Sequence, residues 1–123
     1  MKVNIRNVGF HNNRVGILTD GGVSTATVAV NATVLNSSFD GSTNGGVAAG
    51  TNTQIMVDGS SMTGNNAGIN ANGAGAIVRV GRSSITGNTT SVQAVGGGVI
   101  SSYKTNQIDG NTTNTLPPQI SEE

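Results

Sequence analysis

Short segments that alternate apolar and polar residues recur along the whole chain. They lie at residues 3–5, 32–34, 55–57, 78–80 and 101–103. Alternation with a period of two is typical of β-strands, because successive side chains of a strand point to opposite faces. Gly or Asn interrupts every window long enough for a helix, so the pattern predicts an all-β fold.

The alternating segments belong to an internal repeat. Residues 55–77 return as residues 78–100, with 10 identities in 23 positions. The bulky apolar residue before the turn recurs after one interval of 29 residues and three of 23, and a second apolar point follows each of the first four turns. The first set is Phe10, Phe39, Met62, Ile85 and Ile108, and the second is Ile17, Val47, Ile69 and Val92.

One copy of the repeat cannot bury its own apolar side chains, whereas stacked copies bury a continuous core. We therefore predict a parallel β-helix (β-solenoid) of about five coils of 23 residues, with three short strands per coil. Neither the hexapeptide nor the nonapeptide period of other solenoids is present, and this favours the right-handed form.

A single domain over residues 1–116 accounts for the repeats. The six extra residues of the first interval are placed at 20–31 as an enlarged turn, which is interpreted as a bulge or lengthened strand or as the wall of a substrate groove. Pro117 and Pro118 cannot continue a strand ladder, so residues 117–123 are predicted to form a loose tail.

Composition restricts the partners and the chemistry. Six basic and six acidic residues give no net charge and no basic run, which argues against nucleic acid as a partner. No apolar run approaches the length of a membrane span, and no signal peptide precedes residue 3. The chain has no cysteine and a single histidine, which excludes disulfides and thiolate or multi-histidine metal sites.

Asparagine recurs three residues after the bulky apolar position. This column reads Asn13, Ser42, Asn65, Asn88 and Asn111, and Gly precedes its last four members. Asn tolerates the left-handed conformation, and its amide can hydrogen-bond to the copy in the next coil. We therefore predict an asparagine ladder at this turn.

The turns at 63–65 and 86–88, together with the strand pattern before them, resemble the right-handed β-helix repeats of the pectate-lyase-like superfamily over residues 2–115. The resemblance implies the fold, and it implies a location outside the cell or at the cell surface. Because that superfamily holds lyases, hydrolases, tailspikes, adhesins and proteins without assigned activity, it does not imply one reaction.

In enzymes of that superfamily, the active site lies on the outward face of the first strand of each coil. Two outward columns are predicted here: Asn4, Thr33, Met56, Arg79 and Ser102, and then Arg6, Leu35, Asp58, Gly81 and Lys104. Arg82 follows directly. The resemblance makes Asp58, Arg79, Arg82 and Lys104 the candidate catalytic residues and Asp58 the candidate metal ligand, although an ordinary exposed pair of Asp58 with Arg79 is favoured.

The remaining candidates point away from catalysis. Asp40 and Asp109 share a column but are three coils apart, too far for a hydrolytic carboxylate pair. His11 has no nucleophile pattern around it and is interpreted as a surface or capping residue. The favoured function is a structural or carbohydrate-facing binding module, or part of a longer surface protein, without a cofactor. The alternative is a lyase or hydrolase that acts on an anionic glycan.

Apolar Val3 and Ile5 begin the first strand, and no cap is evident before them. Open strand edges with apolar side chains favour association. We therefore predict a homo-oligomer formed through the first coil, as a closed two-fold dimer rather than an endless stack.

Overall fold

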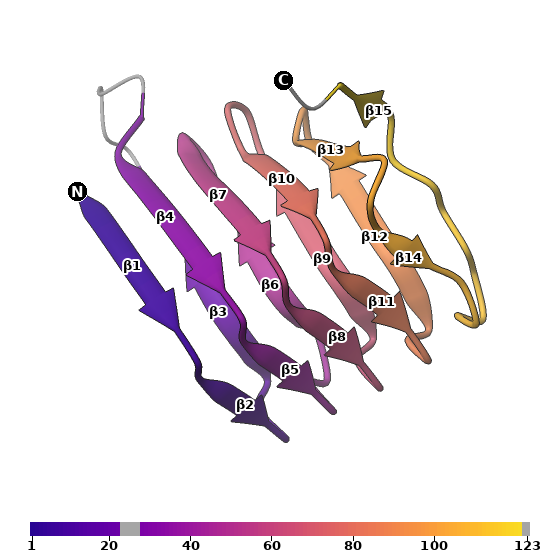
Figure 1. Ribbon diagram of the computed structural model, residues 1–123. Helices are drawn as coiled ribbons and strands as arrows, with labels where there is room; N and C mark the ends of the chain where they lie inside the picture. Colours follow the sequence, from indigo (N-terminus) through magenta and orange to yellow (C-terminus); the bar gives the residue numbers. More distant parts are fainter. Residues whose placement is uncertain (23–27, 122–123) are drawn as a thin grey trace.

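The chain folds into a right-handed parallel β-helix (Figure 1). The computed structural model describes residues 1–22 and 28–121. In Figure 1 the front strands run downward, the rear strands return upward, and successive coils advance to the right. The predicted fold class and its three strands per coil are confirmed. The described residues contain no helix, and so none that could cross a membrane.

Three parallel sheets run along the helix axis. Sheet A contains β1 (Lys2–Arg6), β4 (Val30–Leu35), β7 (Thr53–Asp58), β10 (Ile77–Gly81), β13 (Val99–Tyr103) and β15 (Gln119–Ile120). Sheet B contains β2 (Gly9–His11), β5 (Ser38–Asp40), β8 (Ser61–Thr63), β11 (Ser84–Thr86) and β14 (Gln107–Ile108). Sheet C contains β3 (Val15–Thr19), β6 (Gly45–Ala49), β9 (Ala67–Asn72) and β12 (Thr90–Val95).

The core consists of apolar columns that point inward from the three sheets. Val34, Val57 and Val80 stack in register in sheet A and are fully buried. Phe39, Met62 and Ile85 do the same in sheet B, and Phe10 stacks on Phe39 with ring centroids 5.0 Å apart. β-branched and aromatic side chains fill a pleated, buried surface well, so the repeat forms strands despite its many glycines.

The asparagine ladder lies at the bend between sheets B and C. The backbone N–H and side-chain amide of Asn65 both donate to Oδ1 of Asn88, at 2.9 and 3.0 Å, and Asn88 donates to Asn111 in the same way. Asn111 in turn donates to Oδ1 of Asn114, which ends the ladder at the C-terminal side. Ser42 joins only through its backbone N–H, which donates to Asn65.

The sequence suggested that the ladder asparagines adopt the left-handed conformation. In the structure, other residues of this bend adopt it. Positive φ occurs one position earlier, at Asn12 and at Gly41, Gly64, Gly87 and Gly110. Glycine adopts this conformation without steric cost. The ladder asparagines therefore serve through their hydrogen bonds, while the preceding residue turns the backbone.

The predicted register is wrong in the fifth coil. Val78 pairs with Ile100, and Val80 pairs with Ser102, so Arg79 lies beside Ser101 instead of Ser102. The turn at 96–98 is one residue shorter than the preceding turn at 73–76. Gly98 packs tightly in this turn, and a Cβ there would lie 2.2 Å from the Ala71 carbonyl oxygen.

The predicted loose tail also needs correction. Residues 119 and 120 form β15, which pairs in parallel with β13 in sheet A. Proline lacks an N–H donor but keeps its carbonyl, and the Pro118 oxygen accepts a hydrogen bond of 2.9 Å from the Ser102 N–H. In the enlarged turn predicted at 20–31, residues 30 and 31 begin β4, and residues 23–27 lie outside the described residues.

Candidate functional site

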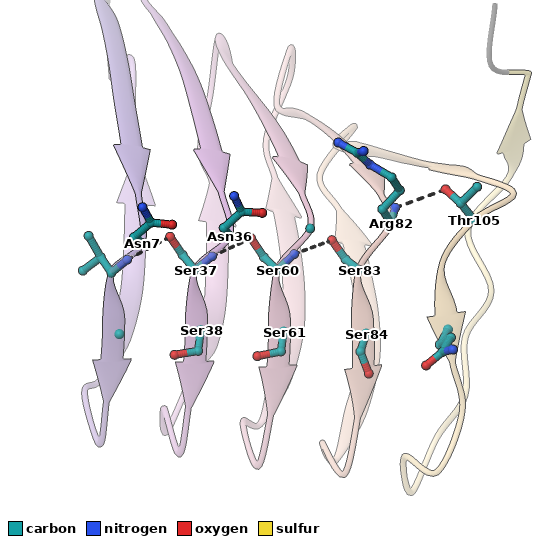
Figure 2. A pocket seen from close by; sticks show the side chains of 14 residues that line it. Asn7, Asn36, Ser37, Ser38, Ser60, Ser61, Arg82, Ser83, Ser84 and Thr105 are labelled. Carbon is teal, nitrogen blue, oxygen red and sulfur yellow. Dashed lines mark hydrogen bonds between the residues drawn. The ribbon is translucent and has the colours of Figure 1, made fainter.

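A polar groove of about 760 Å³ follows the outside of the bend between sheets A and B (Figure 2). It crosses all five coils parallel to the helix axis. Its lining consists almost entirely of small, amide and hydroxyl residues: Asn7, Val8, Gly9, Asn36, Ser37, Ser38, Gly59, Ser60, Ser61, Arg82, Ser83, Ser84, Thr105 and Gln107.

A ladder of buried serines builds the floor of the groove. The N–H of Ser37 donates to Oγ of Ser60 and the N–H of Ser60 to Oγ of Ser83, both at 3.1 Å, as the dashed lines in Figure 2 show. Each hydroxyl donates back to the carbonyl two residues earlier, at Leu35, Asp58 and Gly81. These serines are thus occupied by the fold.

The accessible polar groups lie beside this ladder. Ser38, Ser61 and Ser84 stand in register at the first position of β5, β8 and β11, and each is partly exposed. Asn7 and Asn36 lie on the sheet A side, where their left-handed backbone (φ 56° and 49°) turns the chain. A serine hydroxyl therefore repeats in the second, third and fourth coils along the groove, and an asparagine amide stands beside the first two coils.

Asp58 and Arg82 form an ion pair on the sheet A side of the groove. The Arg82 guanidinium donates from Nε to Oδ1 of Asp58 at 2.9 Å and through a second contact to Oδ2. The carboxylate is largely covered, with 17% of its side chain exposed, whereas the Arg82 side chain is 70% exposed. The hydrogen bond from Arg82 and the charge of its guanidinium lower the pKa of Asp58, against the opposing effect of burial.

The other predicted site residues do not converge on this pair. Arg79 donates to Oε1 of Gln54 at 3.3 Å, so the exposed pair predicted between Asp58 and Arg79 is wrong. The shifted register aligns Tyr103 with Gly81, and Lys104 falls in the longer turn that follows. The predicted cluster of four residues is thus reduced to Asp58 and Arg82.

Asp58 and His11 each have a charged partner. Asp58 is already neutralised by Arg82, and the described residues contain no group of three His, Cys, Asp or Glu side chains suited to a metal ion. His11 lies on β2 with Nδ1 3.8 Å from Oδ2 of Asp40, and both side chains are more than half exposed. The contact is therefore a loose pairing at the surface.

The serine ladder was missed by sequence reasoning, although a signal for it is present. The dipeptides Ser37–Ser38, Ser60–Ser61 and Ser83–Ser84 recur at 23-residue spacing, so one serine of each pair points inward and the other outward.

No protein-family model matches the chain, and neither the curated proteins nor the solved structures contain a match. The case for a function therefore comes from the groove itself.

Proposed function

We propose that this β-helix is a carbohydrate-facing binding module without catalytic activity. The observation that carries the proposal is the groove along the sheet A–sheet B bend, where Ser38, Ser61 and Ser84 repeat the same partly exposed hydroxyl in consecutive coils. A ligand that repeats along its own length matches such a surface, and a glycan chain has the complementary hydroxyl groups.

The charge of the groove favours a neutral glycan over an anionic one. Arg82 is the basic residue among those that line it, and its guanidinium is bound to the Asp58 carboxylate. Binding would rest on hydrogen bonds from hydroxyl and amide groups, which orient a ligand more than they attract it from a distance. A lyase acting on a uronate would instead need an available base and cation binding.

Binding to an array of neutral and acidic glycans tests the proposal, with lyase activity followed in parallel by ultraviolet absorbance in the presence of calcium. Retention of neutral oligosaccharides without turnover is the expected result. Ser61→Leu should weaken the binding of longer oligosaccharides because the new side chain fills the groove. Thr63→Leu is the matched control, since Thr63 is on the same face of β8 outside the groove. Turnover of an acidic glycan would reverse the assignment.

We further propose that copies of the chain associate through the first coil. β1 is the edge strand of sheet A, and the described residues place no strand beside its outer side. Val3, Ile5 and Phe10 pack against the core but remain only partly buried. An unpaired strand edge above half-covered apolar side chains is a surface on which a second copy can pair.

A further inference from the structure

A second hollow, of about 420 Å³, lies on the outer face of sheet C, away from the groove. Its floor is formed by Gly45 and Ala48 of β6, with Leu18 of β3 on one side and Asn70 of β9 on the other. Its size falls within the range of about 300–1,000 Å³ that is typical of small-molecule sites.

The hollow exists because the middle strand carries small residues between larger neighbours. Ala48 is only 8% exposed although it belongs to the outward column between Leu18 and Asn70. Gly45 is not demanded by the backbone, since a Cβ there would meet no atom closer than 3.8 Å. Gly46, by contrast, has the Gly68 carbonyl oxygen 2.9 Å from its Cβ position. A methyl group would fit at Gly45 in ordinary van der Waals contact, so the absence of a side chain there enlarges the hollow.

The two walls differ in character. Leu18 is 64% exposed, which is high for an apolar side chain, and offers a flat aliphatic surface. Opposite it, Oδ1 of Asn70 is buried and has no hydrogen-bond partner among the described residues. A buried polar atom without a partner costs free energy until a partner arrives. Asn70 lines the hollow and is partly exposed, and a ligand group that both donates and accepts can bond to the accessible end of its amide in either orientation.

From these walls we propose that the hollow is a binding site for a single pyranose ring of a neutral sugar. One face of a pyranose is lined by C–H groups and packs on Leu18 and Ala48, while its hydroxyls both donate and accept and so can bond to Asn70. Arg14 and Asp20 lie at opposite ends of β3 and cancel in charge, which leaves no net attraction for an ion. This site does not depend on the groove between sheets A and B.

Titration with glucose and galactose, followed by amide NMR signals, tests this site, with the linear polyol sorbitol as the control for ring recognition. We expect the signals of Leu18, Ala48 and Asn70 to shift with the pyranoses and not with sorbitol. Ala48→Leu should abolish these shifts by filling the hollow, and Leu18→Ser, a change at an exposed position, should weaken binding about tenfold.

Ser61→Leu, which blocks the groove, should leave the shifts unchanged and so separates this site from the groove. Unaltered signals of the buried Val47 and Ile69 would show that each variant is folded. Absence of shifts with the pyranoses, equal shifts with sorbitol, or shifts that persist in Ala48→Leu would each overturn the proposal.

Discussion

Arg82 combines an unfavourable backbone with a favourable side-chain contact. Its φ of 45° lies in the left-handed region, where a side chain costs about 1–2 kcal/mol, and Gly59 occupies the same position one coil earlier. The guanidinium meanwhile pairs with Asp58, the last residue of β7. An ion pair whose basic partner is exposed to solvent contributes about 0–1 kcal/mol, so the two effects are similar in size.

Arg82→Gly is therefore expected to change the free energy of unfolding at pH 7 by less than about 1 kcal/mol, because relief of the backbone offsets loss of the pair. Its pH dependence should change more clearly. The lowered pKa of Asp58 means that the pair stabilises the fold above the ordinary pKa of an aspartate, and that this contribution is lost as the pH falls through the lowered value.

Urea unfolding of both proteins between about pH 5 and pH 2 measures this contribution. The wild type should lose more stability over that interval than Arg82→Gly, since the other carboxylates contribute equally to both. Parallel profiles would show that Asp58 gains nothing from Arg82 in solution.

At the scale of elements, two ladders on opposite sides of sheet B hold the coils in register. At the bend between sheets B and C, successive coils are linked through Asn65, Asn88 and Asn111. At the bend between sheets A and B, they are linked through Ser60 and Ser83. All five side chains are at least nine-tenths buried, so each hydrogen bond is made away from water. Loss of one member leaves its neighbours with unpaired buried groups.

Asn88→Ala is expected to destabilise the protein by about 1–3 kcal/mol, because Asn65 loses its acceptor and the Met62 carbonyl loses its donor. Asn72→Ala is the matched control, since Asn72 is exposed at the end of β9 outside the ladder. Thermal or urea unfolding of the two variants decides the matter. If both variants lose the same free energy of unfolding, the ladder does not contribute specifically to stability.

The ladder can also be extended. Ser42 stands where an asparagine would continue it, and its buried hydroxyl has no partner among the described residues. Gly46 and Gly68 leave room for the amides of Asn65 and Asn88, and Gly16 occupies the matching position for residue 42. Ser42→Asn should therefore stabilise the fold by about 1 kcal/mol through a bond to the Phe10 carbonyl. A lower melting temperature would contradict this reasoning.

The fold and the asparagine ladder could be predicted because both repeat at 23 residues. The fifth coil could not be placed, since Ser101 and Ser102 suit either face and a shift of one residue exchanges the faces of a strand. The sequence also could not predict which arginine pairs with Asp58, because a long arginine side chain reaches several positions. Arg82 was a candidate, and the structure shows that it has a left-handed backbone and pairs with Asp58.

At the scale of the molecule, the first coil differs from the others because its outer side has no neighbour among the described residues. Antiparallel pairing of two β1 strands about Asn4 would place Lys2 of one copy opposite Arg6 of the other. Like charges directly opposite each other destabilise a strand pair. The proposed association is therefore expected to strengthen as salt screens this repulsion.

Sedimentation at micromolar concentration over a range of ionic strength measures the association. We expect a small oligomer whose fraction of the total protein increases with salt concentration. Replacing Val3 and Ile5 by Lys should lower that fraction by adding charge to the contact. A monomer at every salt concentration, with an intact first coil, would refute association through β1.

The central claim is that the groove binds an extended glycan, and the dependence of affinity on ligand length tests it most directly. The groove crosses five strands of sheet B, about 19 Å at the usual strand spacing of about 4.8 Å. Calorimetric titration of Ala48→Leu, in which the hollow on sheet C is filled, with neutral oligosaccharides of increasing length should show affinity that rises with each added sugar and then levels off once the groove is spanned. Affinity that is independent of length, or affinity for longer oligosaccharides that Ser61→Leu leaves unchanged, would contradict the account.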